Sequence, residues 1–130
     1  MRQELFCTND HNRLMVYRED DNSYLQFAHI RESERSILLD SETLTRLSNL
    51  ILGYFNAVKN RANVNDQVNR RFTDSIEFPE YYNLVIWYNV YSHQSTIINI
   101  FMEDEDCGGR EAWLNYDEVV ELYNVLSNLA

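Results

Sequence analysis

Several residue types that mark specialised folds are scarce in this 130-residue sequence, which contains 2 cysteines, 1 proline and 3 glycines. Cys7 and Cys107 are too few for the disulfide framework of a small secreted domain, so we expect two reduced thiols. Three glycines cannot form a glycine-rich phosphate-binding loop. A chain of this length can still bury a core without disulfides or a structural metal, which favours a single domain.

Long apolar runs are also missing. The segment 81–102 is interrupted by several polar residues, among them Asn83, Asn89 and Asn99, so no stretch predicts a transmembrane helix. Residues 1–13 lack the apolar core and the small-residue cleavage site of a signal peptide. The sequence therefore predicts a cytoplasmic protein.

Patterns typical of catalytic or metal sites do not occur. The three histidines form no pair at metal-ligand spacing, and there is no nucleophile elbow. The segment 101–113, FMEDEDCGGREAW, departs from a calcium loop, because the fifth position counted from Asp104 is Gly108 and the twelfth is Asn115. We expect this segment to be a hairpin loop, and the chain to have no cofactor, no metal and no enzymatic activity.

Positive charge is scarce in the second half of the chain. Residues 77–130 contain ten acidic residues and one basic residue, Arg110, whereas residues 1–76 contain eleven acidic and ten basic residues. The second half therefore carries nearly all of the formal net charge of −10, which disfavours binding to phosphate backbones. Such a surface is complementary to a basic one.

Aromatic residues are abundant, with 9 tyrosines, 6 phenylalanines and 2 tryptophans. We expect Trp87 and Trp113 to fill the core of the second half. The strand predicted at 83–88 would carry a cluster of tyrosines: Tyr81, Tyr82, Tyr88 and Tyr91. Two interpretations stay open for them, a tyrosine-rich solvent face or a binding surface, since tyrosine supplies large contact area at low entropic cost.

The two halves of the chain resemble each other in the order of their predicted elements. Each half shows strand, strand, short strand and helix, and identical residues recur at two offsets. The aligned pairs are Asn12 with Asn83, Tyr17 with Tyr88, Leu39 with Leu114, Leu47 with Leu122, and Asn49 with Asn124. The sequence predicts an α+β fold in which two pseudo-repeated strand-strand-strand-helix units form antiparallel sheet packed against two helices. We expect one domain, 1–130, with units at 5–62 and 77–130 and a connector at 63–76.

The two helices are predicted from apolar residues spaced by three and four. Asp40 or Ser41 would cap the first helix and Asn115 the second. The first helix is expected to continue past Gly53.

The charge pattern favours a non-enzymatic, acidic protein-binding module. We expect it to dock on a basic groove of a nucleic-acid-handling partner by mimicking nucleic acid, as small phage and mobile-element inhibitors do, with no membrane contact and no direct nucleic-acid binding. The candidate partner-binding residues are Glu103, Asp104, Glu105, Asp106, Glu111, Asp117, Glu118, Glu121, Tyr88 and Tyr91.

Two alternative functions stay open. The first is a homodimer with a structural or assembly role, since exposed strand edges and tyrosines favour self-association. The second is single-stranded nucleic-acid binding through aromatic residues of the sheet. The tandem order of strands and helix resembles that of single-stranded-DNA-binding transcriptional coactivators, whose unit is a sheet followed by a long helix; the resemblance covers the order of elements.

Overall fold

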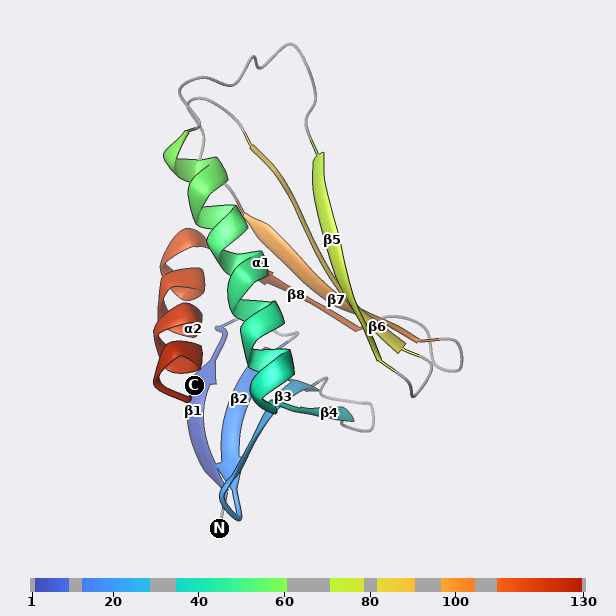
Figure 1. Ribbon diagram of the computed structural model, residues 1–130, viewed down its shortest axis with the longest axis vertical. Helices are drawn as coiled ribbons and strands as arrows, with labels where there is room; N and C mark the ends of the chain where they lie inside the picture. The colour runs from blue at the N-terminus through green and yellow to red at the C-terminus, as the bar shows by residue number, and fades with distance from the viewer. Residues whose placement is uncertain are drawn as a thin grey trace.

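The computed structural model describes residues 2–9, 13–28, 35–60, 71–78, 82–90, 97–104 and 110–129, and within these it has an α+β fold (Figure 1). Two antiparallel four-stranded sheets each pair their strands in sequence order, and each sheet is followed by one helix. The first half comprises β1 (Gln3–Cys7), β2 (Arg13–Glu19), β3 (Asn22–Ala28), β4 (Arg35–Leu38) and α1 (Ser41–Lys59). The second half comprises β5 (Arg71–Phe78), β6 (Tyr82–Asn89), β7 (Ile98–Asp104), β8 (Arg110–Leu114) and α2 (Tyr116–Leu129).

Each half has one strand more than the sequence predicts. The first strands, β1 and β5, were missed because they lie at sheet edges and bury few side chains; in β5 only Ile76 is buried. The predicted connector 63–76 is therefore wrong from Arg71 onward, and its remaining residues, 63–70, lie outside the described ones. The shared order of elements leaves the internal duplication a hypothesis.

A tight turn joins β2 to β3. Glu19 pairs with Asn22, so Asp20 and Asp21 form a two-residue hairpin loop. Both aspartates have positive φ angles, 52° and 67°. This geometry matches the right-handed twist of the flanking strands, and aspartate is one of the few residues other than glycine that adopts it readily.

Both helices begin at the caps that the sequence predicts. Asp40 accepts a hydrogen bond from the backbone N–H of Thr43 at 2.8 Å, and hydrogen bonding by Thr43 holds the pKa of the Asp40 carboxyl below its usual value. Asn115 and Glu118 form a reciprocal capping box, with distances of 2.9 and 3.1 Å. Neither of these helices is long and apolar enough to cross a membrane.

Each helix packs against a strand of the other half. α1 contacts β5 as well as α2, while α2 contacts β1 and β8. Figure 1 shows the two helices lying alongside each other, with α2 next to β1 and α1 crossing in front of the second sheet. One continuous core contains buried residues from both halves, including Leu47 and Leu122, each 0 % exposed. Their predicted burial is confirmed.

The predicted alignment pairs Tyr17 with Tyr88, which implies that the two side chains lie on equivalent faces of their sheets. In the structure this alignment is wrong by one residue. In β2, Leu14 and Val16 belong to the core, so Tyr17 points to the opposite face. Tyr88 instead faces the core, where its ring makes an edge-to-face contact with Tyr54 at 5.2 Å. A shift of one residue in a strand moves every side chain to the other face.

Candidate functional site

The second sheet has one face against the core and one face directed away from it. Along β6, Leu84, Ile86 and Tyr88 are core residues, and the residues between them project to the opposite side, here called the outer face. Pairing between strands extends this alternation across the sheet, because directly paired residues project to the same side. The outer face carries Arg71, Thr73, Ser75, Glu77, Asn83, Val85, Trp87, Asn89, Asn99, Phe101, Glu103, Glu111 and Trp113.

Two tryptophans meet on the outer face, one from β6 and one from the edge strand β8. Trp87 pairs with Asn99, which in turn pairs with Trp113, so the two indoles flank the asparagine from both sides. Their rings are 5.3 Å apart and nearly perpendicular, and Asn99 beneath them is 0 % exposed. Trp113 nevertheless remains 38 % exposed. The pair therefore combines a fixed geometry with accessible ring surface.

The buried asparagine is only partly satisfied. Its Nδ2 donates a hydrogen bond to Oε2 of Glu111 at 3.2 Å, while its Oδ1 has no hydrogen-bond partner in the described part of the chain. An unpaired buried carbonyl oxygen is unfavourable for stability. The contact with Asn99 holds the Glu111 carboxylate beside the tryptophan pair.

A cation already occupies part of this aromatic surface. The guanidinium carbon of Arg71 lies 4.0 Å from the ring centroid of Trp87. Such cation–π contacts are favourable because the ring face carries a partial negative potential. The outer face thus provides, within the chain, an example of the contact that a basic partner side chain would make.

Three carboxylates lie on the outer face beside the aromatic residues. Glu77 and Glu103 both pair with Asn83, which places their strands two strand spacings apart, or roughly 10 Å. Glu111 pairs with Phe101, which is partly buried next to the tryptophans. All three glutamates are exposed, and none forms an ion pair with a described residue.

The structure divides the acidic residues predicted to bind a partner. Glu103 and Glu111 lie on the outer face, whereas Asp117 and Glu121 are exposed on α2, which packs against the core side of the sheet. Glu118 is half-buried and binds the backbone N–H groups of Asn115 and Asn9. Glu105, Asp106 and Tyr91 lie outside the described residues, as does the side chain of Asp104.

The predicted positions of three aromatic residues in the second half are wrong, because each side chain lies on the face opposite to the expected one. Trp87 and Trp113 were expected in the core but lie on the outer face, while Tyr88, expected at a binding surface, is only 7 % exposed. The run LVIWY, residues 84–88, is apolar throughout, so it gives no alternation that shows which side chains of β6 face the core. In β8, by contrast, Glu111 and Trp113 alternate with Ala112 and Leu114, a signal that places Trp113 with the charged residue.

Elsewhere in the described residues the structure offers little reactive chemistry. No group of three histidine, cysteine or carboxylate side chains there could hold a metal ion. Cys7 is a free thiol whose pKa is raised by burial and then by the nearby Glu4 carboxylate, which disfavours the nucleophilic thiolate.

Compared with known proteins, the chain matches no family model, no curated protein and no solved structure. Function must therefore be argued from the outer face and from the charge of the chain.

Proposed function

We propose that this protein is a non-enzymatic binding module that docks on a basic protein partner through the outer face of its second sheet. The observation that carries the proposal is the presence, on one face, of a tryptophan pair, with Trp113 exposed and Trp87 half-buried, and of three carboxylates that lack ion-pair partners among the described residues. Indole faces and carboxylates are the two groups that bind guanidinium and ammonium side chains best.

The charge of the chain supports a basic partner over an acidic one. Residues 77–130 carry ten acidic residues against one basic residue, so they attract a basic surface and accelerate its association. Glu77, Glu103 and Glu111 bring part of this charge to the same face as Trp87 and Trp113. A partner whose basic groove normally holds nucleic acid would suit this face. The mimicry hypothesis is thereby limited to the outer face.

Single-stranded nucleic acid is the second candidate, because Trp87, Trp113 and Arg71 resemble a base-stacking surface. The three carboxylates of the same face would repel the phosphates of a bound strand. A second copy of the chain is a further possible occupant, although the same carboxylates would then face one another. The charge of the outer face therefore ranks a basic protein first.

We also infer that the two halves arose by duplication of a four-strand-and-helix unit. Support comes from the paired registers: from β3 to α1, every position corresponds to one 75 residues later. This single offset relates Leu38 to Trp113 on the outer sides of the sheets, the caps Asp40 and Asn115, and the buried Leu47 and Leu122. The outer faces differ in chemistry, since only the second has tryptophans.

The proposal can be tested by intrinsic fluorescence, because both tryptophans of the chain lie on the outer face. A short oligo-arginine peptide should change the fluorescence saturably at low salt. Oligo-glutamate and oligo-deoxythymidine should give no saturable change. Light scattering of the same samples shows whether the chain is a monomer or a dimer when it binds.

The variant Trp113→Ala should weaken binding of oligo-arginine while leaving the melting temperature close to that of the parent, because its ring is 38 % exposed. Tighter binding of oligo-deoxythymidine than of oligo-arginine would instead support the nucleic-acid candidate. A fluorescence signal that changes only with protein concentration would support self-association.

A further inference from the structure

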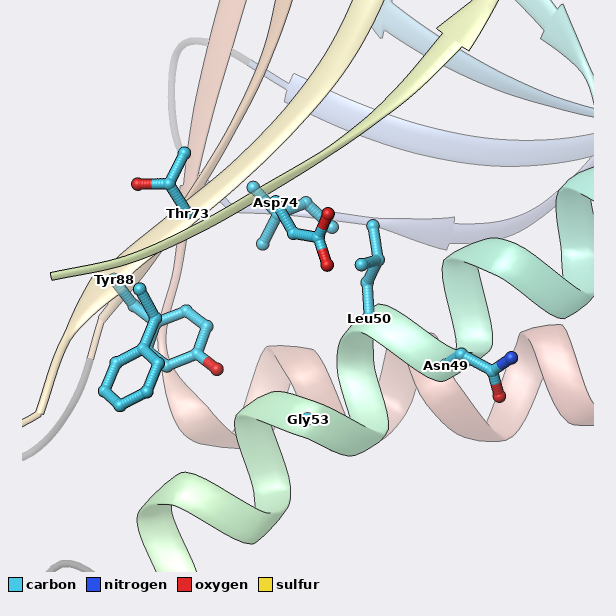
Figure 2. A pocket seen from close by; sticks show the side chains of 8 residues that line it. Asn49, Leu50, Gly53, Thr73, Asp74 and Tyr88 are labelled. Carbon is cyan, nitrogen blue, oxygen red and sulfur yellow. The ribbon is translucent and has the colours of Figure 1, made fainter.

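A cavity of about 150 Å³ lies between α1 and the β5 edge of the second sheet, on the side opposite the outer face (Figure 2). Leu50 and Gly53 of α1 line one side of it, and Asp74, Ile86 and Tyr88 of the sheet line the other. A cavity of this volume can hold a group about the size of a benzene ring.

Gly53 leaves the helical wall of this cavity open. It lies in the interior of α1, where glycine is unfavourable relative to alanine because it has greater freedom in the unfolded chain. A Cβ atom at this position would meet no heavy atom within 4 Å. Packing therefore does not require a glycine here, and its effect is to keep space free above the sheet.

Asp74 brings a charge to a row of paired residues that is otherwise apolar. Asp74 pairs with Ile86, and the same row of the sheet continues through Ile100 to Ala112. Ile86, Ile100 and Ala112 are core residues. Figure 2 shows its carboxylate directed toward α1, whereas the neighbouring Thr73 points the other way. Oδ1 of Asp74 accepts a hydrogen bond from the backbone of the next residue, and the carboxylate forms no ion pair with a described residue.

Tyr88 supplies a second polar atom. Its hydroxyl lies on the α1 side of the sheet in Figure 2, and its ring stacks on Phe72 with centroids 5.3 Å apart. Burial and the nearby Asp74 carboxylate both raise the pKa of Tyr88, so its hydroxyl is neutral at physiological pH and its oxygen can accept a hydrogen bond.

We propose that this cavity binds a small organic cation, consisting of an ammonium group joined to a compact apolar group. The ammonium would pair with the Asp74 carboxylate and donate to the Tyr88 hydroxyl, while the apolar group would pack against Leu50 and Ile86. Among the described residues that line the cavity there is no lysine, arginine or histidine, so none of them competes for the carboxylate. This site is separate from the outer face and does not depend on the function proposed for it.

Titration of the ¹⁵N-labelled protein with benzylamine and with benzyl alcohol tests the proposal, because the two probes share a shape and differ in charge. Benzylamine should shift the Gly53 and Asp74 amide signals saturably, and benzyl alcohol should bind at least about tenfold more weakly, as expected for a lost charged hydrogen bond. Equal binding of the two probes would overturn the proposal, as would the absence of any saturable shift.

Two variants test separately the charge of Asp74 and the free volume beside Gly53. Asp74→Asn changes an exposed side chain and should weaken benzylamine about tenfold or more without unfolding the protein. Gly53→Leu should fill the cavity and abolish binding of both probes. Glu121→Gln, a matched charge removal on α2, should leave benzylamine binding unchanged; an equal loss in this variant would show that only net charge attracts the amine, and would refute the site.

Discussion

Leu47 and Leu122 hold the two helices against the shared core, and each side chain is 0 % exposed. We predict that Leu47→Ala or Leu122→Ala lowers the free energy of unfolding by about 2–5 kcal/mol, because each leaves a cavity in a close-packed interior. Leu52, on the same helix as Leu47 but 40 % exposed, provides the matched control. Leu52→Ala should cost less than about 1 kcal/mol in the same urea titration. Similar losses at Leu47 and Leu52 would contradict the packing described here.

A second prediction at this scale concerns Tyr54, whose pKa is raised from its ordinary value of 10.0 to about 12, first by burial and then by the neighbouring Tyr116 and Tyr88. Between these two values the unfolded chain has lost the phenolic proton while the folded chain retains it. The unfolded state then binds fewer protons, so stability contributed by Tyr54 is complete below pH 10 and is lost as pH rises toward 12.

Tyr54→Phe should remove this dependence. In urea titrations between pH 9 and pH 12, the free energy of unfolding should therefore fall more steeply with pH for the parent than for the variant. Parallel curves over this range would show that burial does not perturb Tyr54.

Individual residues also show where sequence reasoning succeeded. Burial of Leu47 and Leu122 was predictable because helical spacing fixes which side faces the sheet. The positions of Trp87 and Tyr88 were not, because a strand with apolar residues on both faces gives no phase. The tryptophan pair of the outer face was therefore found only in the structure.

At the scale of secondary-structure elements, α2 depends on its N-terminal capping box. Asn115→Ala removes the side-chain acceptor for the Glu118 backbone N–H and should cost about 1 kcal/mol of stability. Asn124→Ala, at an exposed position inside the same helix, should be neutral or slightly stabilising, since alanine favours helices more than asparagine does. Thermal unfolding followed by circular dichroism compares the two, and equal effects would argue against a capping role.

The helices were predictable as elements because their caps and apolar spacing are local signals. The edge strands β1 and β5 were not, because an edge strand with one buried residue is stabilised mainly by backbone pairing to its neighbour. The contacts of α1 with β5 and of α2 with β1 are tertiary features that periodicity alone does not reveal.

For the molecule as a whole, two separate surfaces of the described residues each carry a pair of exposed glutamates. One is the outer face, with Glu77 and Glu103; the other is the side where α2 packs beside β1, with Glu4 and Glu121. The composition predicted the excess of negative charge, but only the sheet registers show that Glu77 and Glu103 share a face with the tryptophans. Two double variants can therefore remove equal charge from different surfaces.

The most direct test of the proposed function measures the affinity of oligo-arginine at several salt concentrations for the parent, for Glu77→Gln/Glu103→Gln and for Glu4→Gln/Glu121→Gln. All four glutamates are exposed, so both double variants should keep the parent melting temperature to within a few degrees. We predict that the outer-face pair weakens binding and flattens its salt dependence, while the Glu4/Glu121 pair leaves both close to the parent. Equal losses in the two double variants would show that the peptide senses only net charge, and would contradict a partner-binding role for the outer face.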